Sequence, residues 1–534
     1  MSTQGKLTLR NYRCFDWENP AVLEFGNGFT AFVGPNNSGK SAALRSVYEL
    51  RNLFGNFIGL VGQNAGFQPQ GTTDVAELSN DSDPTKFQCE IEITEYERPQ
   101  PNHASIAIAV TLECRNQLVT IIKIKAISHT GEFVQYDGPP TQQGIVSINA
   151  TRVGWPYPNG PIDLTDLNNF AGELYRSKYF PAFRNAINEG ASNYYDLPVG
   201  TALVATWDQW KAGSLRSQKI AISRVEDEIA ALLGFKSLQI NADQSGKTLD
   251  INIDGRPQKL YEVGAGVAQL IIVLAAALVH KPPYILIDEP ELSLHPALQL
   301  SFLATLGSYA TKGLLYSTHS ISLARSTAQR IYAVKKIKNG SSKMHPFGDN
   351  VINFGSWLGE LSYSSRVDLG CEGLLLVEGP TDVLFFQEFL RKIQKDHKYV
   401  LMQLGGSSLI NAGVAQHLSE LHRIIDPSKI RVFIDSEKES VDAPLAADRV
   451  AFVNECNKIG IKVQVSERRA TENYFERNGI QKALMSTEYK PLEHYQKLKD
   501  APKHWHKSNN WRIARETEFK DIEKTDLGQF LLSL

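Results

Sequence analysis

The sequence predicts an α/β protein in which a mixed sheet, with an antiparallel β lobe and a helical insertion, precedes a second domain built on a parallel sheet. Three observations lead to this prediction. Apolar and polar residues alternate over 87–127, a helical periodicity follows over about 163–234, and short apolar strands alternate with helices from Gly373 onward. We expect the first domain to span 1–365 and the second to span 366–534.

The composition is that of a folded globular protein. The 534 residues are too many for a single hydrophobic core. Hydrophobic residues make up 42% and charged residues 21% of the chain, so no disordered tract is expected. The formal net charge of -2 argues against a broadly basic surface, and any nucleic acid would be held by local basic stretches such as 467–470 and 503–515.

Cysteine usage and hydropathy indicate a cytoplasmic protein. The 5 cysteines are scattered and lack the spacing of metal ligands, so we expect reduced thiols. The first residues contain no apolar signal region, and the longest apolar run, Leu270–Val279, is about half the length that a membrane helix needs. We therefore expect no membrane interaction.

The first domain begins with three strands and a helix. These strands are expected over 6–12, 21–28 and 29–34, and the helix over 41–54. The antiparallel strands that follow are expected at Phe87–Tyr96, Ser105–Cys114 and Leu118–Ile127. The helical region that comes next is predicted to be an insertion, and we expect it to act as an arm in self-association.

The segment GPNNSGKS matches the pattern G-x-x-x-x-G-K-[ST] without a mismatch, and it lies between a predicted strand and a predicted helix. Backbone N–H groups of such a loop surround phosphate, while Lys40 would reach the terminal phosphates and Ser41 would bind Mg²⁺. A glycine-rich turn with a structural role alone is the alternative, which the flanking elements disfavour. The predicted ATP site comprises Gly34, Pro35, Asn36, Asn37, Ser38, Gly39, Lys40 and Ser41.

A later apolar strand, YILID, ends on a carboxylate that suits the same site. Asp288 would complete the Mg²⁺ shell, and Glu289 would orient the attacking water. Alone, Asp-Glu-Pro after a strand is most often a helix-capping turn, so this assignment depends on the phosphate-binding loop. His319 follows the next apolar strand and could contact the terminal phosphate, although a single histidine is more often structural.

Four segments, LTLRNYRCF, GPNNSGKS, YILIDEPELSLHP and STHS, together resemble the ABC-type ATPase of the SMC, RecF and OLD (overcoming lysogenization defect) families over roughly residues 1–345. The resemblance implies a D-loop at Leu292–Pro296 and a signature loop donated across an interface between two ATPase domains. The candidate signature loop is Val263–Leu270. Ala265 stands where those families have serine, which bears on how efficiently ATP is hydrolysed, and a helix-initiating glycine turn is the structural alternative.

Acidic residues follow the predicted strands of the second domain, GLLLVEG, YVLMQLGG, IRVFIDSE and IKVQVSER. Because helices separate these strands, we expect a parallel sheet with ligands at the carboxyl ends of its strands. Carboxylates that meet there raise one another's pKa unless cations fill the site, and oxygen ligands without Cys or His favour Mg²⁺ or Mn²⁺. Any one acid could instead cap a helix. The predicted ligands are Glu378, Asp382, Asp435 and Glu437.

The arrangement Glu-Gly-x-x-Asp, Gly-Gly and Asp-x-Glu resembles a Toprim domain, the Rossmann-like catalytic unit of topoisomerases, primases and OLD-family nucleases. Leu404–Ser408 supplies the Gly-Gly segment, and Glu437 stands where the motif usually has aspartate. The resemblance implies two divalent ions that activate water at a phosphodiester. The segment 468–475 is similar to the OLD-family segment that supplies a further catalytic and metal-binding acid, here Glu472.

The basic segment 503–515 resembles the OLD-family segment that carries an active-site lysine. Lys507 is the first candidate for this role and Lys503 is the second, and either would stabilise charge on the phosphorane or protonate the leaving oxygen. A solvated basic surface is the alternative. The Pro-aromatic-Arg turn at Tyr179–Arg184 is also similar to the family, but no catalytic role is assigned to it.

By this resemblance, which extends over nearly the whole chain, the protein is identified as a member of the OLD family. Membership implies an ATP-binding, Mg²⁺- or Mn²⁺-dependent DNA endonuclease that is cytoplasmic, regulated by nucleotide and assembled as a homo-oligomer of two or more chains. It also implies a role in antiphage defence, as in Gabija-like and retron-associated systems, with a partner defence protein or a retron RNA–DNA hybrid.

Two other functions stay open. An ATPase that binds DNA structures as a clamp or sensor would use the Toprim unit to bind nucleic acid without cutting it. Topoisomerase or primase activity is disfavoured, because no tyrosine or template-binding module occurs in a recognisable setting. Nicking of supercoiled DNA that depends on Glu378 and Asp435 would distinguish the nuclease from the clamp.

Overall fold

The computed structural model describes most of the chain, in two compact units. The described residues are 3–57, 65–72, 74–95, 107–127, 133–137, 145–147, 153–155, 162–182, 193–337, 340–347, 372–396, 398–404 and 426–534. We call Met1–His295, Thr305–His319 and Arg330–Phe347 the N-terminal unit, and Pro296–Ala304, Ser320–Gln329 and Gly348–Leu534 the C-terminal unit. Gly405–Ser408 of the predicted Gly-Gly segment and Phe183–Arg184 of the Pro-aromatic-Arg turn lie outside the described residues.

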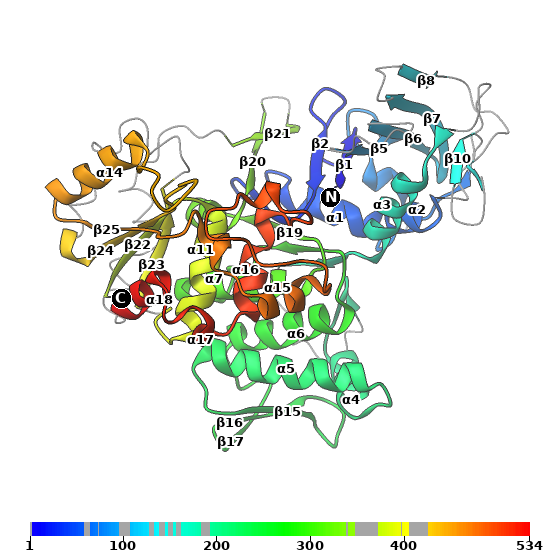
Figure 1. Cartoon of the computed structure of the whole chain (residues 1–534). Coiled ribbons are helices and arrows are strands. Elements are labelled where there is room, and N and C mark those ends of the chain that lie inside the picture. Colours follow the sequence, from blue (N-terminus) through cyan, green and yellow to red (C-terminus); the bar gives the residue numbers. More distant parts are fainter. Residues whose placement is uncertain are drawn as a thin grey trace. The chain divides into compact units, whose positions relative to one another are not determined.

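The N-terminal unit contains an antiparallel β lobe (Figure 1). Its strands, in spatial order, are β2 (Ala21–Phe25), β1 (Thr3–Arg10), β5 (Lys86–Glu95), β6 (Ala107–Arg115), β7 (Leu118–Ile127) and β4 (Ala65–Gly66), and β8 (Phe133–Asp137) pairs with β7. A smaller sheet contains β9 (Val146–Ser147), β10 (Val153–Trp155) and β11 (Ile162–Asp163). The apolar alternation therefore predicted β5, β6 and β7 to within about two residues.

A six-stranded sheet holds the candidate nucleotide site. Its order is β12 (Lys178–Phe180), β18 (Tyr284–Asp288), β19 (Gly313–Thr318), β3 (Gly28–Val33), β20 (Arg330–Lys336) and β21 (Ser342–Pro346). All neighbours are parallel except β20 and β21. Because Val33 lies opposite Thr318, and Ser317 opposite Asp288, the carboxyl ends of three strands meet at one edge.

Helices and small strands complete this unit. They are α1 (Lys40–Glu49), α2 (Arg51–Gly55), η2 (Val75–Leu78), α3 (Thr165–Arg176), β13 (Asn193–Tyr194), β14 (Leu197–Pro198), α4 (Thr201–Ala212), α5 (Arg216–Leu233), β15 (Leu238–Ala242), β16 (Leu249–Ile253), β17 (Arg256–Lys259) and α6 (Ala265–His280). The region expected as a helical insertion contains α3, α4 and α5, but it also contributes β12 to the six-stranded sheet. Three residues are too few to show a periodicity, so the sequence did not predict that strand.

The C-terminal unit is built on a parallel sheet in the order β23 (Tyr399–Gln403), β22 (Gly373–Val377), β24 (Ile430–Ile434) and β25 (Lys462–Val465), as Figure 1 shows. Successive side chains of β22 enter different cores: Leu374 and Leu376 pack with Phe452, whereas Leu375 and Val377 pack with Phe385. Both faces of the sheet are therefore covered, which explains the uninterrupted apolar strands.

The other elements of this unit are mostly short. They are α8 (Ile321–Thr327), α11 (Pro380–Lys392), η3 (Pro427–Lys429), α14 (Ala447–Lys458), η4 (Thr471–Tyr474), α15 (Arg477–Leu484), η5 (Leu498–Asp500), η6 (Lys507–Asn509), α16 (Asn510–Glu516), α17 (Phe519–Ile522) and α18 (Asp526–Ser533). Helix α7 (Pro296–Tyr309) has residues in both units.

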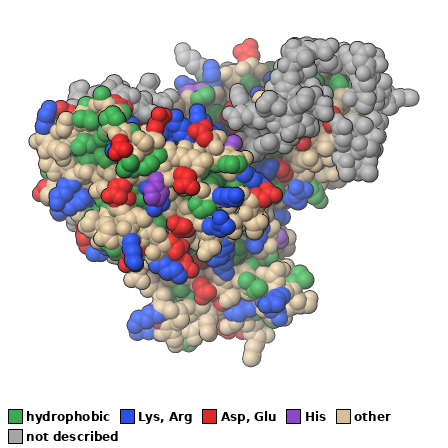
Figure 2. Space-filling view, in the orientation of Figure 1, with side chains coloured by type: hydrophobic (Ala, Val, Ile, Leu, Met, Phe, Trp, Pro, Cys, Tyr) green, Lys and Arg blue, Asp and Glu red, His purple; other side chains and the backbone are tan. Residues whose placement is uncertain are grey.

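Two surface properties bear on the predictions. Among the described residues no helix is long and apolar enough to cross a membrane, and the apolar run of α6 is almost entirely buried. On the face drawn in Figure 2, basic and acidic side chains are interspersed rather than separated into fields of one sign. This mixture agrees with the formal net charge of -2.

Candidate functional site

The phosphate-binding loop joins β3 to α1, as its sequence predicts. Gly39 is the N-cap of α1 with φ 106°, and a Cβ there would lie 2.7 Å from Cys14 Sγ. Glycine is therefore required both by the backbone conformation and by the close packing beneath the loop. Pro35, Asn36 and Asn37 are exposed at its rim.

Lys40 closes over the loop. Its Nζ donates to the carbonyl oxygens of Gly34 and Pro35 at 2.9 Å each, and it lies 3.4 Å from Nε2 of His319. Burial lowers the pKa of Lys40, an effect that nearby acids, Glu289 first among them, oppose. Phosphate oxygens are stronger acceptors than carbonyls, so the ammonium can exchange these partners for a triphosphate.

Ser38 provides a test of whether this loop fits phosphate. Its side chain is 1% exposed, and its Oγ has no hydrogen-bond partner among the described residues. A Cβ on Gly34 would lie 3.1 Å from that oxygen, so the hydroxyl lies against the loop backbone. A buried hydroxyl without a partner costs about 1–3 kcal/mol, which a phosphate oxygen would recover. The loop therefore fits the phosphates of ATP.

The groups predicted to hold Mg²⁺ lie together. The hydroxyls of Ser41 and Ser317 both bond to the carboxylate of Asp288. Burial raises the pKa of Asp288, and the charge of Glu289 adds to this effect. A hydroxyl beside a buried carboxylate at the end of a strand is the donor set that a nucleotide-bound Mg²⁺ uses.

Glu289 and His319 also meet, with Nε2 of His319 3.0 Å from Oε1 of Glu289. Glu289 is buried and has φ 47°, an uncommon conformation for a residue that is not glycine. Sequence reasoning missed Glu291, whose Oε1 accepts from Oγ1 of Thr318 at 2.6 Å and from the backbone N of His319 at 2.9 Å. Its position three residues after Asp288, at the same strand end, was the available signal.

The candidate signature loop lies against the candidate D-loop of the same chain. A Cβ on Gly266 would lie 2.4 Å from the carbonyl oxygen of Ser293, so only glycine permits this approach. Nε2 of the buried Gln269 donates to the carbonyl oxygen of Pro290 at 3.2 Å. Gly264 and Ala265, at the start of α6, are exposed.

A second group of polar side chains forms at the carboxyl edge of the C-terminal sheet. Glu378 directly follows β22, Asp382 lies in the first turn of α11, and Asp435 directly follows β24. The backbone N of Asp435 donates to Oε1 of Glu378 at 2.9 Å. Because β22 and β24 are parallel neighbours, two carboxylates 57 residues apart become adjacent.

Thr471 connects the two aspartates, a role that sequence reasoning missed. Its backbone N donates to Oδ1 of Asp435 at 3.0 Å, and its Oγ1 donates to Oδ1 of Asp382 at 3.1 Å. Asp382 also accepts from the backbone N of Gly379 at 3.1 Å through its other oxygen. Two carboxylates from separate elements are thus fixed by one residue.

Glu472, next along η4, faces Lys507. Nζ of Lys507 lies 3.2 Å from Oε1 of Glu472, and Nδ2 of Asn510 donates to Oε2 at 3.4 Å. Lys503 forms an ion pair with Glu488 on the surface instead. Of the two lysines that the sequence left open, Lys507 lies with the acids and Lys503 does not.

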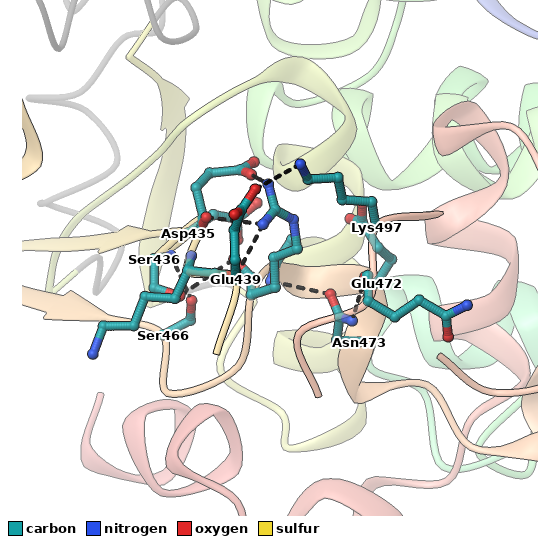
Figure 3. A network of polar contacts seen from close by, with 12 residues as sticks. Asp435, Ser436, Glu439, Ser466, Glu472, Asn473 and Lys497 are labelled. Carbon is teal, nitrogen blue, oxygen red and sulfur yellow. Dashed lines mark hydrogen bonds and ion pairs between the residues drawn. The ribbon is translucent and has the colours of Figure 1, made fainter. Parts of the chain in front are cut away.

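Glu437, the fourth predicted metal ligand, forms an ion pair with an arginine. Its carboxylate pairs with Arg469, whose guanidinium also donates to the backbone oxygens of Glu437 and Lys438 at 2.9 Å each. Glu437 has φ 54°, and its side chain is 38% exposed. A metal-binding role for Glu437 would require this pair to open. Figure 3 shows the surrounding polar network, in which Asp435 and Glu472 are labelled, with the Glu439–Lys497 ion pair at its edge.

We call Glu378, Asp382, Asp435, Glu472 and Lys507 the acidic cluster. Burial raises the pKa of Glu378 to about 7 and that of Asp382 to about 6, and it raises the pKa of Asp435 well above its usual range. The neighbouring carboxylates add to each of these shifts. Burial alone would lower the pKa of Lys507, but Glu472, Asp435 and Asp382 outweigh it and raise the value.

The donors of the acidic cluster fit a divalent cation in their chemistry. They are hard carboxylate oxygens in buried positions, where burial first and neighbouring carboxylates second raise their pKa values. In the part of the chain that the structure describes, no three Asp, Glu, His or Cys side chains are yet arranged to hold a metal ion. The carboxylates bond to protein donors instead, so an ion would have to exchange them.

Comparisons with known proteins concern the ATPase. Residues 6–50 match a family model described as "AAA domain", and residues 164–325 match one described as "AAA domain, putative AbiEii toxin, Type IV TA system". These ranges contain the phosphate-binding loop and Asp288 to His319, respectively. The chain therefore contains an AAA/ABC-type ATPase domain with an α/β fold and a mixed sheet, which supports ATP binding.

Solved structures similar to the chain include three SMC heads. The head domain from Thermotoga maritima has 16% identity and a TM-score of 0.32, covering 64% of this chain and 98% of that one. An SmcHead bound to the C-winged helix domain of ScpA has 14% identity and a TM-score of 0.37, with coverage of 64% and 98%. The Smc head from Pyrococcus furiosus has an extended coiled coil and is bound to the C-terminal domain of ScpA. It has 13% identity and a TM-score of 0.36, covering 68% of this chain and 100% of that one. No curated protein matches the chain.

Proposed function

We propose that this chain is an ATP-binding, divalent-metal-dependent DNA endonuclease of the OLD family, in which a Toprim domain cleaves and the ATPase domain regulates. One observation carries the proposal. Three carboxylates from separate elements, Asp382, Asp435 and Glu472, surround Lys507 at the carboxyl edge of a parallel sheet, in a chain that also has a complete phosphate-binding loop.

The nucleotide site would act through groups already described. Lys40 would bind the terminal phosphates and Ser38 would donate to a phosphate oxygen, while Ser41 and Asp288 would hold Mg²⁺. Glu289 would orient a water molecule, with His319 holding its carboxylate. The nucleotide-dependent state of this domain would permit or restrain cleavage.

The acidic cluster would cut DNA. A bound Mg²⁺ or Mn²⁺ would lower the pKa of water and stabilise charge on the scissile phosphate. Asp382 and Asp435 would hold the ion, and Thr471 would keep their oxygens in position. Lys507, paired with Glu472, would stabilise the charge that develops on the phosphate.

Nicking of supercoiled plasmid tests the proposal. Purified chain is incubated with Mg²⁺ or Mn²⁺, with and without ATP, beside Asp435→Asn and Lys507→Ala; Lys503→Ala is the matched control, because its ammonium pairs outside the cluster. We expect nicking by wild type and by Lys503→Ala, and its loss in the other two. If wild type does not nick the plasmid with either metal, in the presence or absence of ATP, the nuclease proposal is wrong.

A DNA clamp or sensor is the second candidate, and one observation favours it. The carboxylates of Glu378 and Glu472 already pair with protein cations, as a site that binds nucleic acid without cutting it would allow. Such a protein would shift DNA in a gel in an ATP-dependent manner and leave plasmid intact. It would keep this binding after Asp435→Asn.

Family resemblance supplies the biological setting of the proposal. It implies a cytoplasmic homo-oligomer of two or more chains that acts against phage, with a partner defence protein or a retron RNA–DNA hybrid, and no membrane. Plaque counts with Lys40→Ala and Asp435→Asn cells would test the setting, since both variants should lose protection.

A further inference from the structure

Helix α14 places one charged side chain in an apolar row. Its buried residues are Arg449, Phe452 and Cys456, spaced by three and four positions, so all three lie on the face toward the sheet. Arg449 is only 4% exposed. A buried guanidinium is costly unless anions and carbonyls satisfy it, so its partners explain its presence.

Those partners belong to the acidic cluster. Nε of Arg449 donates to the backbone oxygen of Asp435 at 2.7 Å, and Nη2 donates to Oε1 of Glu378 at 3.1 Å. One guanidinium therefore spans the ends of β22 and β24. Its Nη1 lies 3.6 Å from Asp448, which is 29% exposed and so interacts more weakly through solvent.

Charge in the cluster is distributed unevenly. The carboxylates of the acidic cluster are Glu378, Asp382, Asp435 and Glu472; Glu437 also acts on Glu378, but its pairing with Arg469 adds no net charge. Arg449 and Lys507 are the protein cations, and each pairs with one of the outer glutamates. Among the described residues, Thr471 is the common hydrogen-bond donor to the two aspartates. Four negative charges against two positive charges leave an excess of two, which one divalent ion would balance.

We propose that Arg449 is a positioning residue that takes the place of a second divalent ion at Glu378, so that the acidic cluster binds a single divalent ion at Asp382 and Asp435. This inference rests on the proposed metal-dependent function. It departs from the two ions that the Toprim resemblance implies. Arg449 would keep the Glu378 carboxylate paired and in position beside the ion, and it would supply a fixed positive charge there.

Counting bound ions tests the inference. Mn²⁺ is titrated into the full chain without nucleotide, with binding followed by calorimetry and electron paramagnetic resonance, and the sites absent from Asp435→Asn are assigned to the cluster. We expect one such ion in wild type. Arg449→Met should bind two, with magnetic coupling between them, because the vacated charge at Glu378 then attracts an ion.

Two further variants keep the experiment decisive. Arg449→Lys keeps the charge but cannot reach both Glu378 and the Asp435 backbone, so one ion should bind about tenfold more weakly. Arg431→Met, on β24 with its guanidinium bonded to local carbonyls, should match wild type. If Arg449→Met does not fold, the numbers of Mn²⁺ ions bound by wild type and by Arg449→Lys still test the inference.

Two coupled ions in wild type, one ion in folded Arg449→Met, or two in Arg449→Lys would each overturn the inference. The nuclease proposal fails separately. If wild type binds one ion and does not nick plasmid, the role of Arg449 is supported and the nuclease proposal is wrong. If wild type binds two ions and nicks plasmid, the nuclease proposal is supported and the role of Arg449 is wrong. If wild type shows no Mn²⁺ binding that depends on Asp435, both the inference about Arg449 and the nuclease proposal are wrong.

Discussion

The nucleotide site of the N-terminal unit and the acidic cluster of the C-terminal unit both gather carboxylates at the carboxyl edge of a parallel sheet, yet they neutralise them differently. Asp288 and Glu291 take hydrogen bonds from the hydroxyls of Ser317 and Thr318, and Lys40 bonds mainly to loop carbonyls. In the acidic cluster, Arg449 and Lys507 pair directly with carboxylates.

This difference follows from what each site would receive. A nucleotide brings its own negative charge together with Mg²⁺, so a cation that is not committed to an acid is useful there. A phosphodiester brings one negative charge per phosphate, and a cluster with excess carboxylate must first gain cations. Hydroxyl donors suit the first case, and fixed guanidinium and ammonium groups suit the second.

The largest effect is expected from a substitution that removes a paired cation from the acidic cluster. Replacing Lys507 by Ala leaves Glu472 without its ion pair and removes the positive charge that the proposed function assigns to the scissile phosphate. We expect the kcat for nicking to fall by roughly 100- to 1,000-fold, with a smaller change in KM. Single-turnover cleavage measures this, and Lys503→Ala should stay within about twofold. Equal losses in both variants would contradict the assignment.

The next effect separates the two sites. Lys40→Ala should weaken ATP binding by roughly 100-fold, about 2.7 kcal/mol, because the charge-assisted bonds to phosphate are lost. Asp435→Asn should leave ATP binding unchanged. Titration of a fluorescent ATP analogue measures both affinities. A loss of ATP affinity in Asp435→Asn would show that the two sites are not independent in binding.

A smaller effect concerns Thr471, which connects the two aspartates. Thr471→Val removes the hydroxyl bond to Asp382 and keeps the backbone bond to Asp435, so Mn²⁺ affinity should fall about tenfold. Thr471→Ser retains the hydroxyl and should bind Mn²⁺ as wild type does. Calorimetric titration compares the three chains, and wild-type affinity in Thr471→Val would show that the hydroxyl does not position Asp382.

The last effect concerns how the stability of the folded chain depends on pH. The folded-state pKa values of Glu378 and Asp382, about 7 and about 6, exceed their ordinary values, so the folded chain holds more protons than the unfolded chain between about pH 4.5 and 7. That stability is fully present below the unfolded pKa and is lost as pH rises through the folded values. Without metal, the melting temperature should therefore fall from pH 5 to 7.5.

Asp435→Asn removes one charge from the cluster, so at pH 7.5 without metal it should be more stable than wild type by about 1–3 kcal/mol. The difference should shrink at pH 5 and when Mg²⁺ is added. Denaturant unfolding at both pH values measures it, and the exposed Asp500→Asn is the control. A less stable Asp435→Asn at pH 7.5 would mean that the cluster is already neutralised.

Sequence patterns predicted local features because these depend on few neighbouring residues. The phosphate-binding loop needs a glycine with positive φ at Gly39 and a helix after it, and the eight-residue segment GPNNSGKS predicts both. The apolar run of β22 followed by Glu378 likewise predicts a strand end with a carboxylate. The two-residue strand pairs and β12 were too short to leave such a pattern.

Partners across long sequence separations could not be predicted in the same way. Arg449 lies 71 residues from Glu378, and Thr471 lies 89 residues from Asp382. Arginine and threonine at those positions look like ordinary surface or helix residues until packing buries them. Glu437 shows the converse, because its position after β24 suited the metal motif while its side chain pairs with Arg469.

The sequence by itself determined the phosphate-binding loop, the strand ends that carry Asp288, Glu378 and Asp435, and hence the two edges at which chemistry can occur, since a short backbone pattern specifies each. Only the tertiary structure decided which cation or hydroxyl neutralises each carboxylate. That choice depends on burial, where desolvation makes an unpaired charge costly and the nearest donor comes from a distant part of the chain.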